Sequence, residues 1–183
     1  HAGFARDLAA SLKAHPAAWW VGIGRGDFTA ALQPLRDAGV IDRVVLTGPL
    51  DAIAPVLKAC DVYLNEYPEG GYNTVVESMS AGTPVVALSA GSGHAENAGA
   101  GLVGTPDAIA SFDREAYWHL AATWMRDASA RSAAAARQRD RALAKFDYAS
   151  VCGVYEVLYD RLARGEVASP GGVALQGRPV GSP

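Results

Sequence analysis

The stretch PEGGYNTVVESMSAGTPVV, residues 68–86, holds the pattern that decides the fold. An apolar run at residues 62–64 precedes it and is typical of a buried strand. The glycine pair Gly70 and Gly71 then leads into a short helical segment that Gly82 ends, and a proline begins the next apolar run. The order of strand, glycine turn, helix and strand predicts one unit of a parallel sheet covered by helices.

The same alternation runs through the first half of the chain. Continuous apolar runs bounded by turn residues predict buried strands at residues 18–23, 43–46, 61–65 and 84–88. Helical segments lie between these runs, and Asp51 is the predicted N-cap of the segment at residues 51–59. Leu102 and Val103 predict one more short edge strand. We therefore predict an α/β domain with a Rossmann-like, doubly wound parallel sheet.

Helical periodicity dominates the two ends of this predicted domain. Phe4, Leu8 and Leu12 repeat every four residues and predict an amphipathic helix that begins the chain. Three C-terminal helices are predicted at residues 112–126, 129–145 and 148–162. The middle one carries five basic residues, which predict a solvated helix face rather than a ligand patch: Arg131, Arg137, Arg139, Arg141 and Lys145.

Composition places the chain among ordinary globular proteins. Of its 183 residues 50% are hydrophobic and 19% are charged, and the net charge of -3 argues against a nucleic-acid partner. Residues 1–164 are predicted to form one domain, and residues 165–183, rich in Gly, Pro and Ser, a disordered tail. No apolar run reaches the roughly 18 residues of a transmembrane segment. Cys60 and Cys152 are predicted free thiols, which fits a cytoplasmic location.

The glycine turn has the chemistry of an anion site. Gly70 and Gly71 leave room for a ligand to approach the main chain. At the following helix start, the amides of Tyr72, Asn73 and Thr74 have no intrahelical partner and point toward an anion, which the helix dipole also attracts. A diphosphate suits this geometry.

Two glutamates flank the turn. Glu77 lies about one helical turn inside the helix, where its carboxylate can accept hydrogen bonds from both hydroxyls of a ribose. Glu69 lies at the other end and can accept those of a sugar, so the predicted ligand is a nucleotide sugar. From the residues alone a second interpretation stays open, in which Glu77 caps a neighbouring main chain and Glu69 is a solvated loop residue.

Weaker motifs point elsewhere. Gly22, Gly24 and Gly26 match part of a dinucleotide fingerprint, but no acidic residue follows at the distance expected for a ribose partner. His94 and Glu96 have no third ligand at a sensible spacing, so no metal site is predicted. Arg25 is interpreted as a solvated loop residue.

The run from Glu69 to Glu77, with the segment that follows it to Val86, resembles the E-x7-E motif and the E-A-M-x-x-G-x-P-V-V segment of retaining family 4 glycosyltransferases. It departs at Ser78, where the family has Ala, and at residues 71–72, where Phe-Gly is typical. Residues 20–24, 42–48 and 60–64 also resemble family segments, so the resemblance covers roughly residues 3–165.

This resemblance implies the C-terminal, donor-binding half of a two-domain GT-B glycosyltransferase, a hexosyltransferase-like enzyme. It implies that Glu77 holds the ribose, that Glu69 holds the transferred sugar and is catalytic, that the amides of residues 72–74 hold the phosphates, and that the main chain near Leu50 holds the base. It implies no metal and no other cofactor. The N-terminal acceptor-binding domain and the first donor-domain strand are absent from this chain, so we expect this fragment to be inactive alone.

Residues 71–74 and 111–141 also resemble the C-terminal half of protein O-GlcNAc transferases, which invert stereochemistry. The resemblance to that family also implies a ribose ligand at the position of Glu77, so Glu77 keeps its implied role. The implied role of Glu69 as the ligand of the transferred sugar holds only for the retaining family. Two further functions stay open. One is a sugar-nucleotide 2-epimerase of the same fold, and the other is a non-catalytic module for nucleotide-sugar binding or assembly.

Overall fold

The computed structural model describes residues 2–26, 28–68, 70–89, 98–109 and 111–166. Its contacts divide the chain into two units, residues 1–143 and 144–183, and each unit is described by itself. The domain boundary predicted at residue 164 stays a prediction. The predicted tail, apart from Gly165 and Glu166, lies outside the described residues.

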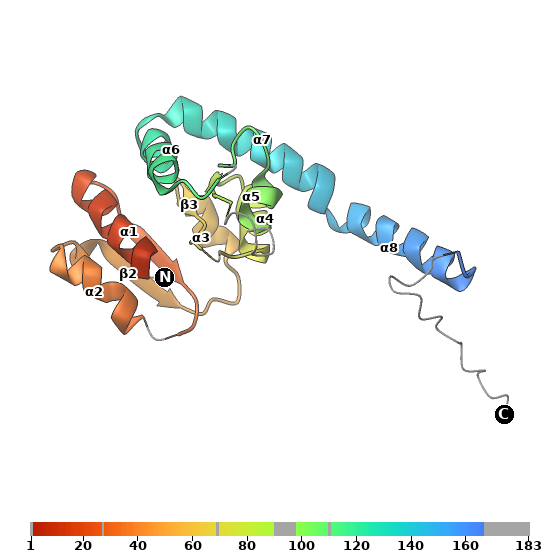
Figure 1. Ribbon diagram of the computed structural model, residues 1–183, viewed down its shortest axis with the longest axis horizontal. Helices are drawn as coiled ribbons and strands as arrows, with labels where there is room; N and C mark the ends of the chain where they lie inside the picture. Colours follow the sequence, from red (N-terminus) through yellow and green to blue (C-terminus); the bar gives the residue numbers. More distant parts are fainter. Residues whose placement is uncertain (1, 27, 69, 90–97, 110, 167–183) are drawn as a thin grey trace. The chain divides into compact units, whose positions relative to one another are not determined.

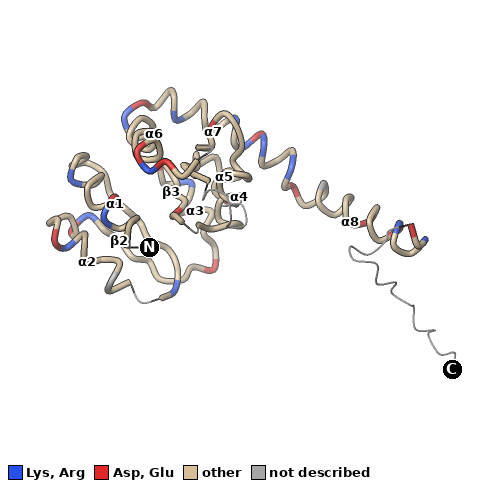
Figure 2. The backbone as a smooth tube through the Cα atoms, in the orientation of Figure 1, with Lys and Arg blue, Asp and Glu red and all other residues tan. Residues whose placement is uncertain are grey.

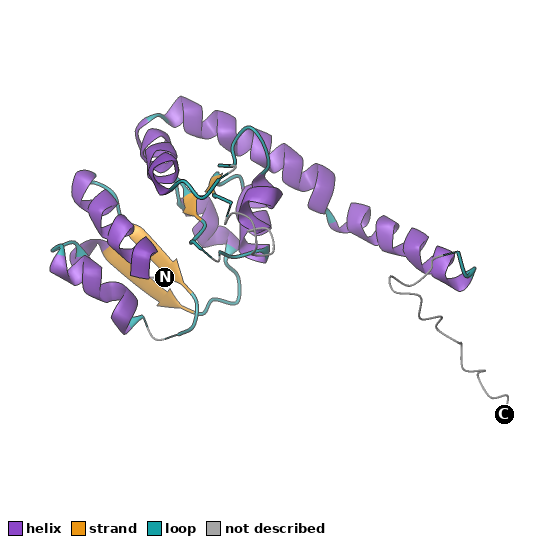
Figure 3. Ribbon diagram, viewed as in Figure 1, coloured by secondary structure: helices purple, strands orange, loops and turns teal. Residues whose placement is uncertain are grey.

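Strands and helices alternate through the first unit (Figure 1; Figure 3). The strands are β1 (Trp20–Ile23), β2 (Val44–Gly48), β3 (Tyr63–Leu64) and β4 (Val85–Val86). The α-helices of the chain are α1 (Ala2–Ala14), α2 (Thr29–Asp37), α3 (Ala54–Ala59), α4 (Asn73–Ala81), α5 (Ala98–Val103), α6 (Arg114–Arg126), α7 (Ala128–Phe146) and α8 (Tyr148–Ala163). A short 3-10 turn (Ile41–Arg43) precedes β2.

All the strand pairing described is parallel. β1 pairs with β2, starting with Trp20 opposite Val44, and β3 pairs with β4. An isolated parallel bridge joins Leu88 to Ile109. Parallel strands joined by helices confirm the predicted α/β class. Each of the four predicted strands is present.

The predicted amphipathic helix is α1, and its apolar stripe forms part of the core. Phe4, Leu8 and Leu12 are each at most 4% exposed. Burying each such side chain stabilises the fold by about 1.5–3 kcal/mol. At the end of α1, Nη1 of Arg43 donates hydrogen bonds to the carbonyls of Leu12 and His15, at 2.8 and 3.1 Å. A cation at this end complements the helix dipole.

Two local predictions are wrong. Leu102 and Val103 are not an edge strand but the last turn of α5, which Gly104 ends with a φ of +69°. An apolar pair this short is ambiguous between strand and helix. Asp51 is not an N-cap, because α3 begins at Ala54 after Ile53, with a proline in its first turn.

The basic residues of α7, drawn in blue in Figure 2, are exposed or half-buried, and some of them also make polar contacts within the first unit. Arg137 forms an ion pair with the buried carboxylate of Asp107 at 2.6 Å. Arg131 pairs with Asp61 at 3.1 Å, and Arg141 donates to the carbonyl of Leu102 at 2.7 Å. These contacts hold α7 against residues 61, 102 and 107 of the first unit.

The side chain of Gln138, in α7, hydrogen-bonds the main chain of β4 in the way that a neighbouring strand would. Its Oε1 accepts a hydrogen bond from the amide of Val85 at 2.7 Å, and its Nε2 donates to the carbonyl of the same residue at 3.1 Å. Gln138 and Val85 are both at most 1% exposed. Each bond therefore satisfies a main-chain group that water cannot reach.

In the second unit, α8 begins after Asp147, whose carboxylate accepts a hydrogen bond from the amide of Ala149 at 3.2 Å. Across both units, none of the described helices combines the length and the apolar composition that a membrane crossing requires.

Replacing Gln138 with alanine is expected to lower the free energy of unfolding by about 2–4 kcal/mol, because the buried N–H and C=O of Val85 both lose their partner. Urea denaturation measures the change. Ser132→Ala, at an exposed position of the same helix, is the control and should stay within about 0.5 kcal/mol of the wild type. Equal stability of Gln138→Ala and the control variant would contradict the role assigned to this side chain.

Candidate functional site

The glycine turn lies where β3 ends and α4 begins. The amide of Tyr63 donates to the carbonyl of Pro84, just before β4, at 2.9 Å, and the amide of Asn65 donates to the carbonyl of Val86 in β4 at 3.0 Å. These bonds fix the strand end. Helix α4 starts at Asn73, and its N-cap, Tyr72, makes no side-chain cap hydrogen bond. No cap from the Tyr72 side chain therefore occupies the first amides of α4, and their contact with a ligand stays a prediction. The helix ends at Gly82, as predicted, with a φ of +85°.

The side chains of Tyr63, in β3, and of Asn65, directly after it, lie against the glycine pair. Tyr63 and Asn65 are two residues apart and so point to the same side of the strand. A Cβ atom at Gly70 would lie 2.4 Å from Nδ2 and Oδ1 of Asn65. At Gly71 it would lie 3.4 Å from the hydroxyl of Tyr63 and from Oγ1 of Thr74. The turn thus packs on these polar side chains, and a side chain at position 70 would force the carboxamide of Asn65 or the turn to shift.

Tyr63 connects the strand with the start of α4. Its hydroxyl shares a hydrogen bond with the side chain of Thr74. Burial raises the pKa of the Tyr63 hydroxyl, the bond with Thr74 lowers it in part, and the nearby carboxylates of Glu66 and Glu77 raise it further. The hydroxyl therefore stays protonated at neutral pH and can donate a hydrogen bond at this edge.

Glu77 occupies the outer side of α4. Its side chain is exposed, whereas the neighbouring Val75, Ser78 and Met79 are fully buried and form the packing side of the helix. Val76, next to Glu77, is half-buried. A carboxylate one turn inside an uncapped helix start is free to accept hydroxyl groups, but its role as a ribose ligand stays a prediction.

The structure tells less about the other predicted site residues. Glu69, His94 and Glu96 lie outside the described residues. Leu50 lies in the turn after β2, where it is 36% exposed, and its contact with a base stays a prediction. Arg25 is exposed in the loop after β1. No group of three or more His, Cys, Asp or Glu side chains able to hold a metal occurs in the described part of the chain.

Sequence reasoning missed Tyr63, Asn65 and Tyr67 as parts of this region. Their signal in the sequence is a polar or amphipathic residue at alternate positions of a short strand that ends at the ligand edge. That signal is weak, because the apolar neighbours of these residues already account for a buried strand.

Tyr67 anchors the chain just before the glycine turn. Its hydroxyl donates to Oδ2 of Asp7 and accepts a hydrogen bond from Nε1 of Trp118 at 2.7 Å. Phe4 and Tyr117 contact its ring edge to face, with centroids 5.3 and 5.2 Å away. These contacts join α1 and α6 to the segment that carries the site.

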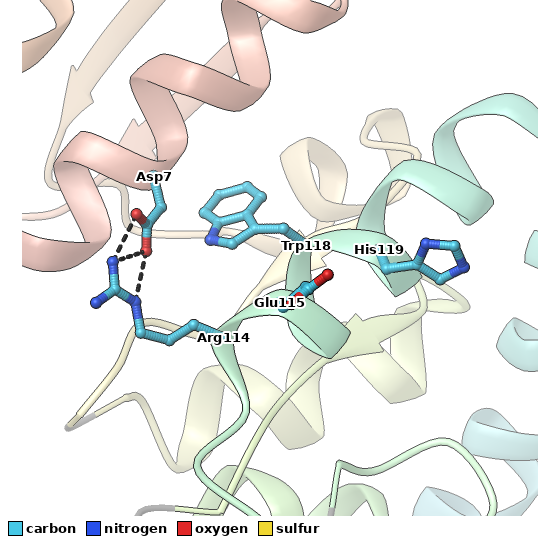
Figure 4. Close-up of a pocket in the computed structure, with 5 residues that line it drawn as sticks. All are labelled: Asp7, Arg114, Glu115, Trp118 and His119. Atoms are coloured by element: carbon cyan, nitrogen blue, oxygen red, sulfur yellow. Dashed lines mark hydrogen bonds and ion pairs between the residues drawn. The ribbon is translucent and has the colours of Figure 1, made fainter.

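A surface depression of about 510 Å³ lies beside this anchor, lined by Asp7, Arg114, Glu115, Trp118 and His119 (Figure 4). Arg114 donates from Nε and Nη2 to both carboxylate oxygens of Asp7, at 2.8 and 2.6 Å. Because this carboxylate already neutralises its guanidinium, Arg114 is poorly suited to hold a phosphate. We therefore place the candidate site at the glycine turn and not in this depression.

The parallel strand pairs, with a glycine turn leading into an uncapped helix, define a Rossmann-like α/β domain whose ligand edge is at the carboxyl ends of its strands. Residues 3–120, more than half of the chain, match the model of the family described as glycosyl transferases group 1. The chain belongs to this family. The resemblance to a GT-B donor-binding domain is thereby confirmed. A comparison with curated protein sequences finds no match.

Solved structures share this fold. A mutant O-GlcNAc transferase of Thermobaculum terrenum matches 88% of this chain with a TM-score of 0.69 and 25% identity. The sucrose-phosphate synthase of Thermosynechococcus elongatus matches 88% with a TM-score of 0.70 and 20% identity. HepE of Anabaena, solved in complex with UDP, matches 86% with a TM-score of 0.68 and 20% identity. The chain spans 33%, 43% and 44% of these three chains respectively.

Replacing Ser78 with alanine is expected to raise the free energy of unfolding by about 1 kcal/mol, because its fully buried hydroxyl has no hydrogen-bond partner. Thermal and urea unfolding measure the change. Ser80→Ala, at an exposed position of the same helix, controls for the higher helix propensity of alanine. If Ser78→Ala gains no more stability than Ser80→Ala, the hydroxyl is not an unsatisfied group.

Replacing Tyr67 with phenylalanine is expected to cost about 1–2 kcal/mol of stability at pH 8, because Asp7 and Trp118 lose their partner. Burial, then the bond to Asp7, raises the pKa of Tyr67 to about 12 from an ordinary value of 10.0. The stabilisation is therefore complete below pH 10 and is lost as the pH rises toward 12. The difference in the free energy of unfolding between wild type and Tyr67→Phe should become smaller between pH 10 and pH 12.

Urea titrations at a series of pH values measure this difference. Tyr148→Phe, at a tyrosine that is 83% exposed, is the matched control. Its free energy of unfolding should equal that of the wild type at every pH from 8 to 12. A difference between wild type and Tyr67→Phe that is constant from pH 8 to pH 12 would contradict the assignment.

Proposed function

We propose that the chain is the donor-binding domain of a glycosyltransferase that transfers a hexosyl group from a nucleotide diphosphate sugar to an acceptor. The observation that carries the proposal is the glycine turn packed on the polar side chains of Tyr63 and Asn65, followed at once by the uncapped start of α4 and by Glu77. Family membership supports glycosyl transfer as the reaction class.

In this proposal the diphosphate binds at the start of α4. The amides of residues 72–74 and the positive end of the helix dipole stabilise the negative charge that develops on the leaving group. The structures of HepE with UDP and with UDP-glucose show that a protein of this fold binds such ligands. No metal is assigned a role.

The two glutamates are proposed to hold the two ends of the donor. Glu77, exposed on the outer side of α4, accepts hydrogen bonds from the ribose hydroxyls. Glu69 contacts the transferred sugar, as the resemblance to the retaining family implies. Leu50 is proposed to lie near the base.

The acceptor is proposed to bind to a separate domain outside these residues. The chain spans 33–44% of the three solved structures compared above, which supports this division of labour. The donor-binding unit then supplies recognition and charge stabilisation, while the acceptor domain supplies the attacking group.

Calorimetric titration of the full-length protein with UDP, GDP and ADP tests the proposal. At least one of these nucleotides should bind, and Glu77→Gln should weaken that binding about 10- to 100-fold. This range corresponds to the roughly 1.5–3 kcal/mol of a hydrogen bond to a charged group. The neutral amide accepts the ribose hydroxyls more weakly than the carboxylate does.

Asp140→Asn removes the same charge from an exposed position of α7 and serves as the control, with no expected change in affinity. Absence of binding by all three nucleotides would overturn the proposed function. Binding that Glu77→Gln leaves unchanged would overturn the role of Glu77 alone.

A further inference from the structure

Asn65 is held rigidly at the end of β3. It is 1% exposed, its amide donates to the carbonyl of Val86 at 3.0 Å, and its carbonyl accepts a hydrogen bond from the hydroxyl of Tyr117 at 3.1 Å. Both main-chain groups are therefore satisfied, and Tyr117 is itself fully buried. The position of this residue is set by the fold and not by its own side chain.

The carboxamide of Asn65, in contrast, makes no hydrogen bond. Neither Nδ2 nor Oδ1 has a partner, although both are shielded from solvent. A carboxamide has two donor hydrogens and an acceptor oxygen with two lone pairs. Most buried side-chain polar groups have at least one partner, so a side chain with none requires an explanation.

The unpartnered carboxamide lies against the ligand-binding turn. A Cβ at Gly70 would lie within 2.5 Å of three atoms of this side chain, so the main chain of Gly70 is in direct contact with the carboxamide. The main-chain groups of the turn are therefore neighbours of the donors and the acceptor of this carboxamide. Gly71 is next in the chain and lies close to the hydroxyl of Tyr63.

We propose that Asn65 is a positioning residue for the nucleotide sugar, and that its carboxamide bonds the main chain of Gly70 and Gly71 only when a diphosphate occupies the start of α4. The inference rests on the proposed function. A hydrogen bond that exists only in the complex contributes to affinity, because a ligand shifts an equilibrium by its differential interaction with the two states. In the free protein the same group is a source of instability.

This arrangement predicts opposite effects of one substitution. Asn65→Leu replaces the carboxamide with an apolar group of similar size and removes the unsatisfied atoms. The melting temperature of the free protein should rise by about 2–4 °C. The dissociation constant of UDP, the probe used, should increase about tenfold, as expected when one or two hydrogen bonds are lost.

Ser78→Ala is the matched control. Ser78 is the other residue in the described part of the chain with a fully buried, unpartnered side-chain oxygen, but it lies on the packing side of α4. Its replacement should raise the melting temperature while the dissociation constant of UDP stays unchanged. The comparison separates relief of a buried polar group from loss of a bond made in the complex.

Calorimetry with UDP and thermal unfolding of the full-length protein decide the outcome. A higher melting temperature with unchanged affinity in Asn65→Leu would overturn the positioning role. A lower melting temperature would also overturn the proposal, because it would mean that the carboxamide already bonds in the free protein. Failure of the wild type to bind any of UDP, GDP and ADP would instead refute the proposed function.

A second measurement needs no substitution in the tested protein. The side-chain amide protons of Asn65, assigned by their absence in Asn65→Ala, should exchange more slowly with solvent in NMR spectra once UDP is bound. An exchange rate that UDP does not change would overturn the proposal independently of the result for Asn65→Leu.

Discussion

The main chain at Gly70 approaches the side chain of Asn65 so closely that no residue with a Cβ fits there without a shift of that side chain or of the turn. This contact sets the path of the turn across β3. Helix α4 begins at Asn73, directly after the turn. Its first amides therefore lie near the carboxyl end of β3. The position of Glu77 follows, since it lies one turn further along the same helix.

The segment before the turn is held by a different kind of contact. Tyr67 lies in an aromatic cluster with Phe4 and Tyr117, and its hydroxyl bonds Asp7 and Trp118. A buried hydroxyl with satisfied partners adds directional restraint to a core that is otherwise apolar. The candidate site is thus held in place by β3, which the turn contacts, and by α1 and α6, which contact Tyr67.

Membership of the glycosyl transferases group 1 family agrees with this construction. Solved structures with only 20–25% identity to this chain share its fold. Such divergence is tolerated because a fold depends on the pattern of apolar and polar positions more than on the identity of each side chain. Gly70 is one of the positions that the geometry itself constrains, through its close approach to Asn65.

The sequence by itself determined the fold class and the location of the candidate site. The period of Phe4, Leu8 and Leu12, the four apolar runs and the glycine-capped helix are local patterns, and each follows from the preferences of neighbouring residues. These patterns sufficed to place a strand, a glycine turn and a helix start in the right order.

Only the tertiary structure decided what surrounds the site. The bonds of Gln138 with Val85 and of Tyr117 with Asn65 join residues 53 and 52 positions apart in the chain. Local preference left the pair Leu102 and Val103 ambiguous, and it left the partner of each arginine in α7 open. No pattern of neighbouring residues encodes contacts over such separations, because they depend on how complete elements pack together. For that reason the unpartnered carboxamide of Asn65 becomes visible only in the folded chain.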